Sequence, residues 1–308
     1  MAGITDLPFR RAVLRFGAGL VTSEMVASAE MVLDKSSARS RAEFDADCGS
    51  SVQLAGRDPR WMGEAARMLR DRGVRMIDIN MGCPAKKVTG GQSGSALMQS
   101  PDLAVRMIEA TAAAGVPVSV KMRLGWCADT LSAPSLARRA EGAGAVMVTV
   151  HGRTRTQFYK GRADWDAVRA TVDAVSIPVV VNGDVIDEAT AKDALKRSHA
   201  SAVMVGRGAQ GAPWRPAEIA SALDLGTGFT RPCPARVADL VIAHYDDALS
   251  FYGVELGARV MRKHLGWYLA EAGADCRTRG EILREDQPNA VRRLLRNAFS
   301  AAPDRCAA

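Results

Sequence analysis

A single cysteine follows one of the apolar runs of the chain. Residues 77–87 read IDINMGCPAKK, so a run typical of a buried strand ends in Asn80 and Gly82 and then presents Cys83 before a proline. Free cysteine is most often a small buried apolar residue. A position just after a strand, on a loop that proline stiffens, instead favours a chemical role. A thiol with a pKa of about 8.5 is neutral near pH 7 yet releases its proton readily, so Cys83 is a candidate general acid.

Two other strand ends carry side chains that could hold a ligand. Lys121 ends the run SVKMR, and His151 opens VHGRTR with Arg153 two residues later. A lysine at the mouth of a barrel must meet an anionic or electron-rich group that offsets its desolvation. A lone histidine is usually structural, but the neighbouring glycine and arginines favour a ligand site.

Two glycine-containing loops are candidates for holding a phosphate. One contains Asn182, Gly183 and Asp184, and the next contains Gly206 and Arg207. Parallel barrels commonly bind phosphate at these loops through backbone N–H groups. The glycines could instead only permit tight turns. The two loops together favour a phosphorylated ligand.

Short β-rich runs alternate with helical stretches over the first two thirds of the chain. They lie at residues 20–25, 50–55, 76–81, 116–122, 145–150, 177–182 and 202–206. This alternation predicts parallel βα units, and polar residues after the strands predict an α/β fold of the (β/α)8 TIM-barrel type. A closed barrel needs eight strands, so we expect the first barrel strand to be missing and Met1 to be an internal methionine. The alternative is that a misread element or the C-terminal region fills the gap.

The remainder of the chain has a different pattern. We expect a catalytic barrel domain at residues 1–223, a linker rich in Gly, Pro and Thr at 224–235, and an all-helical domain at 236–308. Its helices carry basic clusters, which on helix surfaces are often only solvated faces. These clusters consist of Arg259, Arg262 and Lys263, and of Arg292, Arg293 and Arg296.

Composition restricts the class of protein. The 308 residues carry a net charge of +7 with a pI near 9.3, which suits a polyanionic partner but is also common without one. The six cysteines form no CxxC pair, which argues against zinc, iron–sulfur and disulfide sites, so we expect no metal. We take the other five, Cys48, Cys127, Cys233, Cys276 and Cys306, as structural or incidental. With no secretion signal and no apolar run of about 20 residues, we expect a cytoplasmic, monomeric protein without a membrane segment.

Many separate motifs occur in a familiar order. They are MAGITDLPFR, TSEM, VQLAG, DINMGCPAKKV, GSALM, VKMRLGW, VHGRTR, VNGDV and MVGRGAQGAPW. Together they resemble the tRNA-dihydrouridine synthase family, most closely its bacterial B-type members. The resemblance runs from Met1 to about Trp214 and recurs in RVMRKHLGWY at 259–268.

The resemblance implies a flavoprotein that modifies tRNA. An FMN-loaded barrel with a C-terminal helical domain would take hydride from NADPH or NADH and reduce a tRNA uridine to 5,6-dihydrouridine. Cys83 would protonate C5, Asn80 would orient the uracil, and Arg153 would lie near the substrate. The basic helical clusters would contact the RNA backbone. The positions that match flavin contacts are Met1, Ala2, Gln53, Lys121, His151, Asn182, Gly183, Asp184, Gly206 and Arg207.

Family members carry a strand and usually Ala-Pro before the Met of MAGIT, which agrees with the expected missing strand. Two other functions stay open from the sequence. One is a related flavin barrel acting on a free pyrimidine, which would need no basic helical appendage. The other is a non-catalytic RNA-binding relative, although the presence of Cys83 and Lys121 argues for catalysis.

Overall fold

The computed structural model describes residues 1–45, 49–225 and 228–300. These form two compact units. The barrel unit consists of Met1–Leu7 and Gly19–Gly206, and the helical unit consists of Pro8–Ala18 and the chain from Arg207 onward. The domain boundaries expected from the sequence at residues 223 and 235 stay a prediction. In the described part of the chain, no helix is long and apolar enough to cross a membrane.

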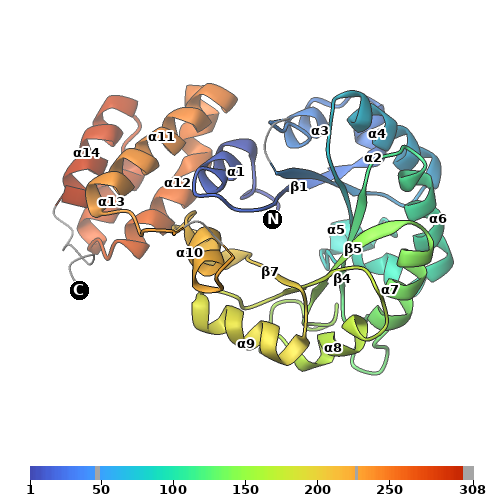
Figure 1. Cartoon of the computed structure of the whole chain (residues 1–308). Coiled ribbons are helices and arrows are strands. Elements are labelled where there is room, and N and C mark those ends of the chain that lie inside the picture. The colour runs from blue at the N-terminus through green and yellow to red at the C-terminus, as the bar shows by residue number, and fades with distance from the viewer. Residues whose placement is uncertain (46–48, 226–227, 301–308) are drawn as a thin grey trace. The chain divides into compact units, whose positions relative to one another are not determined.

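The barrel unit is built on one parallel sheet of seven strands in chain order. The strands are β1 (Val21–Ala27), β2 (Ser50–Ala55), β3 (Ile77–Met81), β4 (Val118–Arg123), β5 (Ala145–His151), β6 (Val179–Asn182) and β7 (Ala202–Met204). The sheet curls, with helices along its outside (Figure 1). The predicted α/β class and all seven predicted strands are therefore confirmed.

Edge strands β1 and β7 both lie close to the N-terminal residues. The Gly3 N–H donates to the Glu24 carboxylate on β1. The Met1 sulfur lies 3.8 Å from the place where a Cβ on Gly206, just after β7, would be. Residues 1–5 thus lie near both edge strands of the sheet. They form a turn in which the Ile4 and Thr5 N–H groups donate to the Met1 carbonyl.

Helices connect the strands, and local sequence signals set their ends. Asp58 caps α4 (Pro59–Asp71) by accepting from the Arg60 N–H, and Asp187 and Thr190 form a reciprocal capping box on α9. The remaining helices of this unit are α2 (Ser28–Val32), α3 (Ser36–Arg41), α5 (Lys86–Thr89), η1 (Gly94–Gln99), α6 (Pro101–Ala112), α7 (Ala133–Gly142), α8 (Asp166–Val172) and α9 (Glu188–Ser198).

The helical unit has its own apolar core. Its elements are α1 (Leu7–Leu14, joined to this unit from Pro8), η2 (Arg207–Ala209), α10 (Arg215–Ala222), α11 (Pro234–Tyr252), α12 (Val254–Glu271), α13 (Cys276–Arg284) and α14 (Pro288–Ser300). Tyr245, Leu265, Leu269, Leu295 and Phe299 are among the side chains buried in one cluster. These helices agree with the helical bundle that the sequence predicts at this end of the chain.

Helix α1 joins this bundle through two buried histidines. The Phe9 ring centroid lies 5.8 Å from that of His244 and 5.3 Å from that of His264. Arg11 adds an ion pair of 2.9 Å with Asp247 on α11. Burial lowers the pKa of His264 to about 3, with a further lowering from Lys263, and lowers that of His244 well below its ordinary value. Both imidazoles therefore pack as neutral rings near pH 7.

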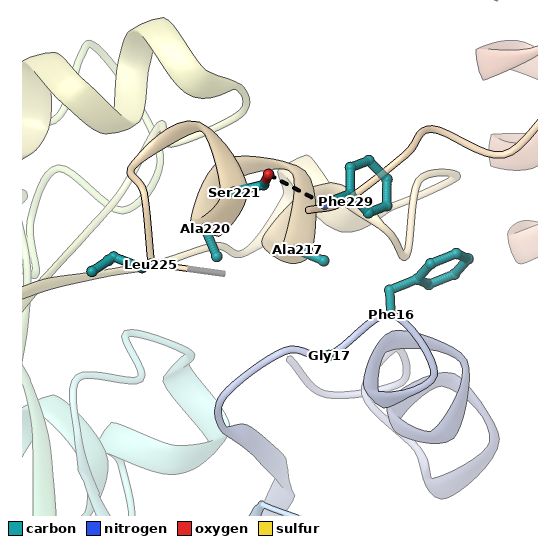
Figure 2. A pocket seen from close by; sticks show the side chains of 7 residues that line it. All are labelled: Phe16, Gly17, Ala217, Ala220, Ser221, Leu225 and Phe229. Carbon is teal, nitrogen blue, oxygen red and sulfur yellow. Dashed lines mark hydrogen bonds between the residues drawn. The ribbon is translucent and has the colours of Figure 1, made fainter. Parts of the chain in front are cut away.

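The helical unit also holds a small pocket (Figure 2). Phe16, Phe229, Ala217 and Ala220 line it, and the Ser221 hydroxyl, which accepts from the Phe229 N–H, is its polar side chain. The residues around it carry no titratable group.

We expect Leu295→Ala to lower the free energy of unfolding of the helical unit by about 2–5 kcal/mol, because Leu295 is fully buried and its truncation leaves a cavity. Leu256→Ala, at an exposed position of α12, is the matched control and should change it by less than about 0.5 kcal/mol. Urea denaturation followed by helical ellipticity measures both. Equal losses in the two variants would contradict the proposed core.

Candidate active site

The inner face of the curled sheet is polar. Side chains alternate between the two faces of a strand, and on β3, β4 and β5 one face is apolar and fully buried, as with Ile79, Val120 and Val150. Helices α4, α6 and α7 lie outside the curl (Figure 1), so the apolar face lies toward them and the other face is turned inward. The inward residues are Asp78, Asn80, Ser119, Lys121, Arg123, Thr149 and His151.

A buried carboxylate lies at the centre of this face. Asp78 is 2% exposed, and it accepts from the Ser119 hydroxyl at 2.7 Å and from Gln53 Nε2 at 2.6 Å. Burial raises its pKa to about 6, while these two hydrogen bonds and the charge of Lys121 lower it. The Gln53 oxygen in turn accepts from Asn80 Nδ2 at 2.7 Å. One hydrogen-bond network thereby joins β2, β3 and β4.

Lys121 has no hydrogen-bond or ion-pair partner among the residues that the structure describes. Its strand register places it between Asn80 on β3 and Thr149 on β5. Burial lowers its pKa to about 8; Asp78 raises it, Arg123 lowers it, and Cys83 raises it. The Thr149 hydroxyl beside it is buried, and it has no hydrogen-bond partner in the part of the chain that the structure describes. A partly buried ammonium next to such a hydroxyl is suited to an electron-rich ligand.

The backbone of Cys83 is held on both sides. Its N–H donates to Asn80 Oδ1 at 2.9 Å, and its carbonyl accepts from the Ser95 hydroxyl at 2.9 Å. Gly94, at φ +61°, lies so close that an added Cβ would be 2.9 Å from the Cys83 carbonyl oxygen. Asn80, whose oxygen also accepts from the Gly82 N–H, therefore shapes the turn that presents the thiol.

Sequence reasoning missed Arg123 as a functional residue. This arginine is 1% exposed, and its Nε donates to the Gly82 carbonyl at 2.8 Å. Its Nη1 donates to the carbonyls of Thr154 and Phe158, each at 2.8 Å. The loop that carries Cys83 is thus tied to the loop that follows β5. One sequence signal could have identified it. Side chains two residues apart on a strand lie on the same face, so Arg123 had to share the face of Lys121.

A second buried arginine fixes the end of β5. Arg153 donates to Asp184 Oδ2 at 2.6 Å and to the Gly161 carbonyl at 2.8 Å, and its Nη1 lies 3.2 Å from His151 Nε2. Because a guanidinium only donates, His151 accepts with that nitrogen. Gly183, at φ +111°, must lack a side chain because a Cβ would be 2.9 Å from both Ala163 Cβ and the His151 ring. His151, Arg153, Gly183 and Asp184, which the sequence assigned to different parts of the site, thus lie together.

The candidate phosphate residues divide between the units. Asn182 Nδ2 donates to the Met204 carbonyl at 2.8 Å, which places the loop after β6 beside β7. The space around Gly206 is open apart from the Met1 sulfur. Ala2 is exposed in the N-terminal turn. Arg207 is the first residue of the helical unit, so it is not placed against the barrel residues here.

Most of the predicted RNA-contacting cations face carboxylates within the helical unit. Arg262 pairs with Asp286 at 2.5 Å and Arg292 with Asp246 at 2.9 Å. Arg259 pairs with Glu255 at 3.1 Å, and Arg296 lies 3.6 Å from Asp239. Arg293 and Lys263 are exposed. The two clusters therefore occur on α12 and α14 as separate sets, with much of their charge locally balanced.

The other cysteines have simpler surroundings. Cys127 contacts the Thr130 hydroxyl at 3.2 Å in the loop after β4, and Cys233 and Cys276 are exposed at the starts of α11 and α13. Cys48 and Cys306 lie outside the described residues. Within the described ranges, no group of three or more His, Cys, Asp or Glu side chains is arranged to hold a metal ion.

Fold and site together define an α/β barrel protein that places its reactive groups at the carboxyl ends of parallel strands. A family model described as dihydrouridine synthase matches residues 1–302. The chain is 56% identical to a probable tRNA-dihydrouridine synthase of Rhodobacter capsulatus, with 97% of this chain and 93% of the relative covered. It is 40% identical to tRNA-dihydrouridine synthase B of Vibrio parahaemolyticus, with 98% and 90% covered. The chain therefore belongs to the dihydrouridine synthase family.

A solved structure agrees with the fold alone. Histamine dehydrogenase from Rhizobium sp. 4-9 superimposes with a TM-score of 0.50 at 11% identity, covering 97% of this chain and 61% of that one. The family assignment confirms the resemblance that the ordered motifs gave.

We expect Lys121→Met to raise the pKa of Asp78 above its value of about 6, because the substitution removes a cation that favours the ionised carboxylate. Carbon-detected NMR titration of labelled aspartate side chains measures this pKa directly. Lys192→Met, which removes an exposed lysine paired with Glu188 on α9, is the control and should leave it unchanged. An unchanged or lower Asp78 pKa in Lys121→Met would show that the two groups do not interact.

Proposed function

We propose that this chain reduces uridines in tRNA to 5,6-dihydrouridine with a bound flavin and a nicotinamide reductant. The observation that carries the proposal is the Cys83 turn. Hydrogen bonds hold the backbone of Cys83 on both sides, and the turn follows β3 on a polar barrel face where Lys121 has no ion-pair partner among the described residues. Membership of the dihydrouridine synthase family and the names of the relatives support it.

The residues of the polar face fit FMN. Lys121 and the unsatisfied Thr149 hydroxyl are suited to an electron-rich ring system, and the open backbone at Gly206 with the tight turn at Gly183 is suited to a phosphate. Gln53, His151, Asn182, Asp184 and Arg207, with Met1 and Ala2 of the N-terminal turn, complete the proposed binding set. When bound and reduced by NADPH or NADH, the flavin supplies the hydride that adds to C6 of uracil.

Cys83 supplies the other hydrogen. The S–H bond breaks as a C5–H bond forms, and the electron pair of the S–H bond stays on sulfur as a thiolate. We propose that the cationic side chains of Lys121 and Arg123, which interact electrostatically with Cys83, offset the negative charge that develops on this sulfur. Water then reprotonates the thiolate. The second amide N–H of Asn80 is proposed to orient the uracil, and Arg153 is proposed to lie near the substrate.

The substrate must leave its base stack to reach this face. Extruding a base costs a few kcal/mol, which contacts to the RNA backbone have to offset. We propose residues 236–308 as the tRNA-binding domain next to the catalytic region at 1–223, with Arg259, Arg262, Lys263, Arg292, Arg293 and Arg296 as backbone contacts. Since carboxylates already face four of these arginines, each contributes less than a free cation would. We propose a monomer acting in the cytoplasm.

We expect Cys83→Ala to retain flavin absorbance but to form dihydrouridine about 10²–10⁴-fold more slowly, because a positioned general acid contributes a factor of that size. Mass spectrometry of nucleosides from a tRNA transcript, incubated with enzyme and NADPH, measures the rate. Cys276→Ala, at an exposed cysteine of the helical unit, is the control and should react normally. Normal turnover in Cys83→Ala would remove Cys83 as the acid, and reduction of free uracil by the wild type would favour a free-pyrimidine enzyme.

A further inference from the structure

Two loops at the mouth of the barrel unit form one braced structure. We call them the rim: residues 124–132 follow β4, and residues 154–162 follow β5. The Arg155 N–H donates to the Gly125 carbonyl at 2.9 Å, and the Thr156 N–H donates to the Trp126 carbonyl at 3.0 Å. A Cβ on Gly125 would overlap the Thr130 carbonyl, so this turn accepts only glycine. The two loops are therefore held together through their backbones.

A cation that contacts two aromatic rings joins the two loops of the rim. The Arg155 guanidinium lies 4.5 Å from the centroid of Trp126 and 5.3 Å from that of Phe158. Such contacts strengthen as the cation is desolvated, and Arg155 Nε is buried without a hydrogen-bond partner in the described residues. Arg155 thus acts as a brace between the two loops.

The rim is attached directly to the turn that carries the thiol. Arg123 donates to the Gly82 carbonyl on one side, and to the Thr154 and Phe158 carbonyls of the rim on the other. The Tyr159 ring, 55% exposed, lies over the same guanidinium. One guanidinium therefore holds residues 154–158 of the rim next to the loop that carries Cys83.

The charges of the rim are available to an anion. Lys160 and Arg162 are exposed, and neither has an ion-pair partner in the part of the chain that the structure describes. Several other surface cations already face carboxylates: Lys192 pairs with Glu188, Arg169 lies 3.6 Å from Asp173, and four of the basic helical residues named above do so too. A cation without a carboxylate partner has no ion pair to give up when a phosphate approaches.

We propose that the rim binds the phosphates that flank the target uridine, with Lys160 and Arg162 as the contacts and Arg155 as the brace that fixes their loop. This inference rests on the proposed function and specifies where the RNA is held next to the reacting base. It assigns the backbone contacts nearest the reacting base to the barrel unit rather than to the helical clusters.

The test compares two variants that lose the same charge from the same unit. Lys160→Ala/Arg162→Ala removes the rim cations, and Arg169→Ala/Lys192→Ala removes two that already face carboxylates. Binding of a fluorescent tRNA transcript is measured by anisotropy over a series of KCl concentrations. For the rim variant we expect affinity to fall by about tenfold, and the slope of log K against log salt to shrink by about one per cation. The control should bind as the wild type does.

Two further readouts keep the result interpretable. Oxidation of NADPH by the flavin without tRNA should stay at the wild-type rate in the rim variant, since neither cation belongs to the proposed flavin site. If the alanine pair lowers the melting temperature, Lys160→Gln/Arg162→Gln replaces it. A wild-type salt slope in a folded rim variant overturns the proposal. If the wild type forms no dihydrouridine, the proposed function is wrong. If the wild type forms dihydrouridine but the rim variant binds tRNA with the wild-type salt slope, only the rim proposal is wrong.

Discussion

The burial of one carboxylate determines how the site is organised. Removing Asp78 from water disfavours its charge, so the surrounding strands must supply hydrogen bonds and a cation to keep it in place. Ser119 and Gln53 supply the hydrogen bonds, and Lys121 supplies the charge. Gln53 then holds Asn80, and Asn80 holds the backbone of Cys83. The position of the Cys83 backbone thus depends on a hydrogen-bond network that is centred on Asp78 and joins β2, β3 and β4.

Two buried arginines likewise determine how the loops around the site are held, because buried charged groups need hydrogen-bond partners. Arg123 and Arg153 each donate to two or more backbone carbonyls of segments that have no regular structure of their own. Buried guanidinium groups are costly unless they are satisfied, so these loops adopt the conformations that satisfy them. An inner face this polar is a poor way to stabilise a barrel, whose interior is ordinarily packed with branched apolar side chains. It is consistent with a site shaped for a bound ligand.

Local patterns predicted much of this arrangement. Apolar alternation located all seven strands, and the polar residues near the strand ends included Lys121 and His151, which the strand register places on the same inward face. Arg123 escaped because its acceptors are carbonyls 31 to 41 residues away, and no sequence period records such contacts. The pairing of Arg292 with Asp246 and the inclusion of α1 in the helical unit escaped for the same reason. Contacts between distant segments depend on packing, which a single sequence does not display.

The most direct test of the central claim is the product itself. A tRNA transcript without modified nucleosides is incubated with the purified protein and NADPH, then digested and analysed by mass spectrometry. The account predicts dihydrouridine, formed only when both protein and reductant are present, in step with the loss of uridine. Consumption of reductant with no dihydrouridine in the digested RNA would contradict it.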